Sequence, residues 1–343
     1  MTSASIIINS VTQGLTPREK EVLFGRYGLE KGGKPQTLAA LGERYHVTRE
    51  RIRQIEVGAL KVAKKNIAAH AELMRALEQV KKFLKDAGGV AEQGALVAYA
   101  KSVVPGTTEN HLAVVIDASK AFSFFPDDKL FRPFYYLDKK SLAHAQAFIK
   151  EWVQTLKAKR AHALSGKYHE HLQEFIARKG LPTAHAESIL GISKELHVNP
   201  YGDKGLAAWP EIRPKTIRDR VYLVLKKQGK PLHFRALART INEVGFNARK
   251  ASAPTVHNEL IKDARFVLVG RGLYALAEHG YQPGTAKEVI QRILKKDGPM
   301  SPRQIIMAVQ KERFFKENTV LVNLQNKILF TRLGDGSYQV REA

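Results

Sequence analysis

Cysteine is absent from this chain of 343 residues. Without thiols there can be no disulfide framework, no thiolate zinc site and no cysteine nucleophile, and this composition suits a reducing compartment. Acidic residues are also scarce, since 33 Asp and Glu stand against 56 Lys and Arg. The net charge of +23 favours a polyanion as partner, nucleic acid before a membrane surface.

Long hydrophobic runs are missing as well. No segment approaches the roughly 20 apolar residues that a membrane-spanning helix needs. The first ten residues, MTSASIIINS, lack the basic start and the long apolar stretch of a signal peptide. We therefore expect no membrane partner and a cytoplasmic, nucleoid-associated location.

Sequence motifs of catalysis are not found either. The chain has no phosphate-cradling GxxxxGK[ST] loop, no HExxH and no GxSxG. Its carboxylates form no convincing catalytic set, and His169 and His171 have no companion ligand at metal-binding spacing. We expect no enzyme, no metal and no cofactor, although the sequence leaves an unfamiliar nuclease open.

The most informative stretch that is present runs from Val47 to Lys65, VTRERIRQIEVGALKVAKK. It predicts one amphipathic helix with Thr48 as N-cap. Spacings of three and four residues place its apolar stripe at Ile52, Ile55, Ala59 and Val62. The opposite face carries Arg, Glu and Gln first and lysines last, as in a helix that reads base edges and then contacts phosphates.

The preceding residues complete a helix-turn-helix. Residues 36–45 predict a short helix, and His46 to Thr48 form a tight connection into the long one. Further upstream, residues 15–27 begin with Thr16 as N-cap and Glu19 as its capping-box partner. The three helices together predict a compact module over residues 1–68.

This module resembles region 4 of the housekeeping sigma factors of bacterial RNA polymerase. The resemblance rests on LTPREKEVLFGRYGL and on TLAALGERYHVTRERIRQIEVGALK, and VTRERIRQIE is its most specific part. In that family the module reads the minus-35 promoter hexamer and docks on the flap of the polymerase β subunit. It ends the sigma-factor chain, whereas here it stands at the beginning and covers only a small part of the sequence.

The resemblance implies DNA-contacting positions at Arg49, Glu50, Arg51, Arg53 and Gln54. The helix pattern adds the N-cap and the basic end of the same helix. The full predicted interface is Thr48, Arg49, Glu50, Arg51, Arg53, Gln54, Lys61, Lys64 and Lys65. The alternative is that these side chains form only the solvated face of a helix in an unrelated protein.

The middle of the chain predicts two modules, residues 69–140 and 141–212. In the first, a helix over 68–87 and two more helices precede an aromatic ribbon on either side of Pro126–Lys129, which is the outline of a winged helix. The aromatic residues there fit a packed ribbon better than a base-stacking surface. The second module is expected to be a divergent copy, with strands around 190–198 and 206–209.

Residues 213–282 resemble the HARE-type winged helix, which also occurs in the delta subunit of bacterial RNA polymerase. KQGKPLHFRALARTI and FVLVGRGLYAL carry this resemblance. The winged-helix pattern places a possible secondary DNA-binding set on the third helix and the wing tip, at Thr255, His257, Asn258, Lys262 and Arg271. The alternative that this copy binds protein is equally open.

Residues 283–343 repeat the plan of three helices and a ribbon. The predicted fold is therefore mainly α with small β-ribbons, an N-terminal helix-turn-helix followed by tandem winged-helix domains. Charge is concentrated at the far end, because residues 211–343 hold 25 Lys and Arg against 12 Asp and Glu, compared with 12 against 6 in residues 1–70. The C-terminal part is thus the stronger electrostatic candidate for phosphate contacts.

Three functions remain in competition. The first is a sigma-like transcription factor that binds double-stranded promoter DNA and contacts bacterial RNA polymerase core. The second is an accessory polymerase protein that acts by docking, and the third is an adaptor of a DNA-modification system. Since the sigma-factor modules for the minus-10 element are not found, we expect the protein alone not to open a promoter.

Overall fold

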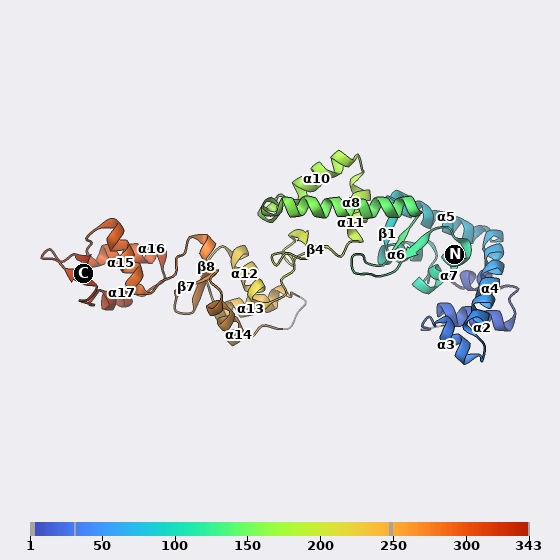
Figure 1. The fold of residues 1–343 in the computed structure, drawn as a ribbon, viewed down its shortest axis with the longest axis horizontal. Helices are drawn as coiled ribbons and strands as arrows, with labels where there is room; N and C mark the ends of the chain where they lie inside the picture. The colour runs from blue at the N-terminus through green and yellow to red at the C-terminus, as the bar shows by residue number, and fades with distance from the viewer. Residues whose placement is uncertain (1–3, 31, 247–249, 342–343) are drawn as a thin grey trace. The chain divides into compact units, whose positions relative to one another are not determined.

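The computed structural model describes residues 4–30, 32–246 and 250–341 (Figure 1). The chain divides into an N-terminal unit, Met1–Leu196, and a C-terminal unit, His197–Ala343. Both consist mostly of helices with small antiparallel sheets, which confirms the predicted fold class. The division falls inside the predicted module 141–212, and the bounds of the five predicted domains stay predictions.

The N-terminal unit begins with four helices: α1 (Ala4–Thr12), α2 (Pro17–Tyr27), α3 (Leu38–Arg44) and α4 (Arg49–Ala69). The predicted capping box of α2 is present. The Thr16 hydroxyl accepts the Glu19 N–H at 3.4 Å, and the Glu19 carboxylate accepts the Thr16 N–H at 2.9 Å. Helix α1, which the sequence analysis did not predict, packs against α4.

Helix α4 does not continue into the next helix as predicted for residues 68–87. It ends at Ala69, and His70 leaves the helical conformation with φ −96° and ψ 98°. The His70 ring then caps α5 (Ala71–Asp86) by accepting the N–H of Leu73 at 3.4 Å. A histidine side chain that satisfies a free backbone donor thus creates a bend that the apolar spacing alone does not reveal.

The module after α5 contains β1 (Val90–Glu92), α6 (Gln93–Val103), α7 (Glu109–Ser119), β2 (Ser123–Phe125) and β3 (Phe134–Tyr136). Its sheet has three strands in the order β1-β3-β2, one more than the predicted ribbon. Most of its aromatic side chains are buried, namely Phe122, Phe131, Phe134 and Tyr135. The packing role predicted for them is confirmed, with Phe124 exposed as the exception.

These first two segments share one hydrophobic core. It joins residues of α1, α2 and α4, including Ile7, Tyr27 and Ala63, to residues of α5, α6, α7 and β3. The helix-turn-helix is therefore built onto the module that follows it, and its orientation is fixed by that packing.

The rest of the N-terminal unit is helical. It comprises α8 (Lys139–Ala158), α9 (Arg160–His162), a π-helical turn η1 (Ala163–Lys167), α10 (Tyr168–Lys179) and α11 (Thr183–Gly191). The strand expected from residue 190 is wrong at its start, because 190 and 191 still belong to α11. The observed hairpin consists of β4 (Leu196–Val198), where the division between the units falls, and β5 (Lys204–Leu206), which overlaps the predicted 206–209 only at Leu206.

The C-terminal unit contains two modules with the same element order as residues 71–136. The first has α12 (Ile217–Gln228), β6 (Leu232–His233), α13 (Phe234–Val244), α14 (Ala253–Lys262), β7 (Phe266–Gly270), β8 (Leu273–Leu276) and the 3-10 turn η2 (Ala277–His279). Its strands are ordered β6-β8-β7. Arg271, predicted to stand at the wing tip, lies in the loop between β7 and β8.

The second module has α15 (Ala286–Asp297), α16 (Pro302–Glu312), α17 (Glu317–Leu324), β9 (Phe330–Arg332) and β10 (Tyr338–Val340). A single bridge between Met300 and Tyr338 stands where the other modules have their first strand. Ser301 caps α16, with its hydroxyl accepting the Gln304 N–H at 3.4 Å. The assignment of these modules to the winged-helix and HARE families stays a prediction.

Candidate nucleic-acid interface

The helix-turn-helix rests on a small core of its own. Val22, Leu41 and Ile52 are fully buried where α2, α3 and the first half of α4 meet. The turn between α3 and α4 is tight, since a Cβ on Gly42 would lie 2.8 Å from the Val47 carbonyl oxygen. His46 completes the turn in the left-handed region with φ 53°. The predicted connection is therefore confirmed, and Gly42 is the residue that permits it.

Two arginines of α2 fix the angle between these helices. The Arg18 guanidinium lies 3.9 Å from the centre of the Tyr45 ring and donates to the Tyr45 carbonyl at 3.1 Å. Arg26 forms an ion pair with Glu56 of α4 at 3.1 Å and donates to the Gln36 carbonyl at 3.1 Å. Because Arg18 holds the residue that ends α3 and Arg26 holds α4 itself, α4 is presented in one orientation on α2.

The predicted interface residues all lie on the exposed side of α4 or at its start. Thr48 is the N-cap, and its hydroxyl accepts the Arg51 N–H at 3.2 Å. The remaining eight side chains are exposed: Arg49, Glu50, Arg51, Arg53, Gln54, Lys61, Lys64 and Lys65. The lysines lie three to four turns further along, about 18 Å or more from the helix start at 1.5 Å per residue.

Pairs within α4 hold the polar side chains of its first two turns. The Arg53 guanidinium donates to both Glu50 carboxylate oxygens, at 2.9 and 2.7 Å. Arg51 donates to the Gln54 side-chain oxygen at 3.3 Å. The hydrogen bonds from Arg53 lower the pKa of Glu50, so this carboxylate remains charged at neutral pH. Solvent-exposed pairs of this kind are weak, and a competing partner can open them.

The opposite side of the module is covered. Helices α1 and α7 pack on α4, and the Asn110 amide of α7 donates to the carbonyls of Gly28 at 2.8 Å and Gly33 at 3.3 Å. The Tyr27 hydroxyl donates to Asp117 of α7 at 2.8 Å. Sequence reasoning missed these contacts, because residues more than 70 positions apart leave no local pattern. As a result, α4 offers solvent its polar side rather than an apolar one.

Residues 13–64 match sigma-70, region 4. This region 4 segment contains α2, α3 and most of α4. The first part of the predicted resemblance is thereby confirmed, while the match does not extend to the C-terminal unit.

Individual proteins show the same similarity. The RNA polymerase sigma factor SigA of Nostoc sp. is 50% identical over 54 residues, 16% of this chain and 14% of that protein. SigA of Clostridium acetobutylicum is 55% identical over 47 residues, 14% and 12% of the two chains. RpoD of Neisseria gonorrhoeae is 43% identical over 60 residues, 18% and 9%. The matches thus span a small fraction of each relative, and no solved structure matches the chain.

The predicted secondary set in the C-terminal unit is divided between packing and exposed positions. The His257 ring is half-buried, 4.7 Å from the Phe234 ring and 5.9 Å from Tyr274. The Thr255 hydroxyl shares a hydrogen bond of 2.7 Å with the N-cap Ser252. Four side chains of the set are exposed: Thr255, Asn258 and Lys262 on α14 and Arg271 in the loop after β7.

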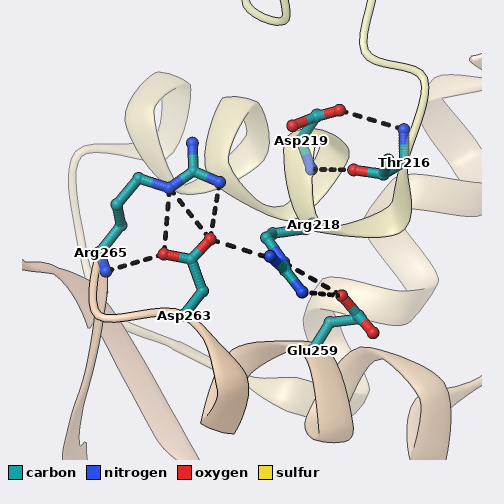
Figure 2. Close-up of polar contacts among 6 residues, drawn as sticks. All are labelled: Thr216, Arg218, Asp219, Glu259, Asp263 and Arg265. Carbon is teal, nitrogen blue, oxygen red and sulfur yellow. Dashed lines mark hydrogen bonds and ion pairs between the residues drawn. The ribbon is translucent and has the colours of Figure 1, made fainter.

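Ion pairs anchor α14 to α12 and to the start of β7 (Figure 2). Arg218 of α12 donates to Glu259 of α14 at 3.1 and 3.0 Å and lies 3.5 Å from Asp263. The Arg265 guanidinium donates to the same Asp263 carboxylate, and the shortest of these hydrogen bonds is 2.7 Å. Hydrogen bonds from Arg265 lower the pKa of Asp263. The capping box of Thr216 and Asp219 fixes the start of α12 beside this network.

Neither a cluster of metal ligands nor a membrane-spanning helix occurs in the described parts of the chain. No group of three or more His, Asp or Glu side chains there is arranged to hold a metal ion. None of the helices within those parts is long and apolar enough to cross a bilayer.

Proposed function

We propose that this protein is a sequence-specific, DNA-binding transcription factor of sigma-like type, and that its region 4 segment reads a promoter element. The observation that carries the proposal is the exposed polar side of the first two turns of α4, in a segment that matches sigma-70, region 4. The proposal includes no catalytic step and places the protein with the chromosome in the cytoplasm.

In this proposal the N-terminal half of α4 enters the major groove of duplex DNA. Arginine binds the O6 and N7 atoms of guanine, glutamine binds adenine, and a carboxylate accepts from the cytosine amine. Arg49, Arg53, Gln54 and Glu50 supply these groups. The pair between Glu50 and Arg53 opens on binding and is replaced by contacts to bases. A base that satisfies only one of the two leaves the other unpaired, which adds discrimination.

The lysines toward the end of α4 contact phosphates in this arrangement. Phosphate contacts position a protein on DNA without reading sequence, and they make binding salt-dependent. The C-terminal modules, proposed as winged helices of HARE type, add contacts of the same class through Asn258, Lys262 and Arg271. The excess of cations in residues 211–343 supports this assignment.

The second candidate is docking on bacterial RNA polymerase. It is supported by the relatives of the region 4 segment, which are RNA polymerase sigma factors. The two functions are compatible, because a factor that reads a promoter element can bind polymerase through another surface. A pull-down of purified core polymerase without DNA tests this candidate separately.

In vitro selection from random-sequence duplex DNA tests the first proposal with the full chain. We expect the wild-type protein to enrich one short motif and Arg53→Ala with Gln54→Ala to enrich none. Arg75→Ala, which removes one exposed arginine from α5, is the matched control and should enrich the wild-type motif. Selection of no motif by the wild-type protein would reject sequence-specific reading.

A further inference from the structure

The C-terminal unit contains an apolar groove between its two modules. The groove has a volume of about 580 Å³ and is lined by residues around β7 on one side and by residues 283–286 and 314–319 on the other. Its most exposed apolar side chains are Leu268 and Phe314, at 52% and 53% exposed. Single exposed apolar side chains are common on protein surfaces. Two large ones in the same groove are typical of a binding surface.

The two walls of the groove are held in fixed positions. The Phe314 N–H donates to the Val269 carbonyl at 2.8 Å, and Phe314 bridges Gly270 in parallel pairing. Gly270 makes this approach possible, since a Cβ there would lie 3.1 Å from the Phe314 side chain and carbonyl oxygen. The segment after α16 thereby covers part of the outer edge of β7.

The side chain of Arg313 also connects the two walls of the groove. Its side chain is almost fully buried and donates to the carbonyls of Leu268 and Gln282, which belong to β7 and to the link before α15. Burial lowers the pKa of this guanidinium. Arg313 thus connects β7 of one module to the link that precedes α15 of the other. Because these hydrogen bonds hold the two walls together, the groove has a fixed shape and is not a gap between mobile parts.

Charge at the rim indicates the kind of occupant. Arg271 and Lys316 stand exposed at the groove, and no acidic residue is among its lining residues, all of which belong to described parts of the chain. The Glu288 carboxylate behind this wall accepts the Thr285 N–H at 2.6 Å as part of a capping box. A ligand that fits must therefore combine apolar side chains with negative charge.

We propose that this groove binds a peptide segment of a partner protein in which Leu, Ile or Phe side chains alternate with Asp or Glu. Apolar side chains of the segment pack on Leu268 and Phe314, and its carboxylates pair with Arg271 and Lys316. While the peptide is bound, Arg271 is not available for the DNA contact proposed above. A second copy of this chain fits less well, because two surfaces with the same excess of cations repel each other. Duplex DNA also fits less well, since DNA interfaces are polar and bury little apolar wall.

Peptide display on the full chain tests the proposal. A random peptide library is selected at about 150 mM salt, where exposed charges are screened beyond about 8 Å. Peptides that also bind the double variant Leu268→Ser, Phe314→Ser are removed. We expect the survivors to carry apolar residues beside Asp and Glu. A synthetic survivor should bind the wild-type protein at least about tenfold more tightly than the double variant, the ratio that hot-spot residues commonly give.

Matched variants separate the contributions. Met307→Ser with Val322→Ser removes two exposed apolar side chains that do not line the groove and should leave peptide affinity unchanged. Arg271→Gln with Lys316→Gln should weaken binding several-fold and reduce its dependence on salt. Unchanged circular dichroism and thermal midpoints of all three double variants show that folding is preserved.

Three results would overturn the proposal. They are a library that yields no peptide distinguishing wild type from the groove variant, survivors that are basic or uncharged, and a groove variant that loses duplex DNA affinity tenfold without any peptide effect. The last result would assign the groove to nucleic acid. Since none of these depends on reading by α4, the peptide proposal and the DNA proposal can fail independently.

Discussion

Helices α4 and α14 occupy corresponding places as the last helix of a helix-turn-helix and of a three-helix module, yet they present different surfaces. In the first two turns of α4, Glu50 pairs with Arg53 and Arg51 with Gln54, and these four side chains remain exposed. On α14, Glu259 is bound to Arg218 of a neighbouring helix and His257 packs between aromatic rings. A helix whose polar groups are not used in holding the fold is free to use them on a ligand.

Removing the support beneath each helix gives the largest expected effect. Ile52→Ala and Leu260→Ala each delete a side chain that is buried under its helix, and each should lower the free energy of unfolding of its module by about 2–5 kcal/mol. Urea denaturation followed by hydrogen exchange locates the loss. We expect only Ile52→Ala to abolish selection of a DNA motif, and equal loss in both variants would erase the contrast between α4 and α14.

Changes on the helix surfaces come next. Arg53→Ala or Gln54→Ala should cost about 1–3 kcal/mol on the selected duplex and little on random duplex, because a bidentate base contact is lost. Asn258→Ala should cost under about 1 kcal/mol on both duplexes, as expected for a phosphate contact that reads no sequence. Fluorescence anisotropy at fixed salt measures both. Loss of sequence preference in Asn258→Ala would make α14 a second reading helix.

Acid should weaken the pairing of Asp263 with Arg265, which helps to anchor α14. The pKa of Asp263 is lowered in the folded chain, so its pairing with Arg265 stabilises the C-terminal unit above the unfolded pKa of about 3.9 and is lost as pH falls through the lower folded value. We expect Asp263→Asn to cost about 1 kcal/mol near pH 7 and less toward pH 3, given that its partner is partly exposed. Asp297→Asn, at an exposed position, is the control in pH-dependent thermal unfolding.

The smallest effects are expected at the lysines. Lys64→Ala and Lys65→Ala should each reduce the slope of log affinity against log salt by about 1 and weaken selected and random duplexes alike. Titrations at several salt concentrations measure this slope. A preference for the selected duplex that changes in either variant would contradict the assignment of these side chains to phosphates.

Local patterns in the sequence predicted the helix-turn-helix well. The N-cap of α4, the capping box of α2 and the buried stripe that includes Ile52 follow from side chains within a few residues of one another, and all are confirmed. The bend at His70 was not predicted, because the apolar spacing continues across it. The strands β1 and β6, which add a third strand to each ribbon, were also not predicted. Segments of two or three residues have no recognisable strand pattern and are identified only by their pairing with another strand.

For the candidate site, the sequence analysis identified the exposed residues of α4. It did not predict the pairs among these side chains or the packing of α7 on the covered side of the module. The pairing of Arg53 with Glu50 follows from helix spacing and could have been predicted. The contacts of Asn110 could not, because they depend on how α7 folds back onto α2 and its loop. On α14, the helix pattern placed His257 on the exposed side, whereas its ring is attracted to the aromatic pair beside it.

The shared core of α1, α2, α4 and α7 has a practical consequence for anyone who wishes to study the region 4 segment by itself. A shortened protein that stops near residue 68 would expose Tyr27, Ala63 and Ile67 to water and would be prone to aggregation. One that continues past β3 to Leu137 retains the partners of these side chains. Crystallisation with a duplex should therefore start from the longer piece.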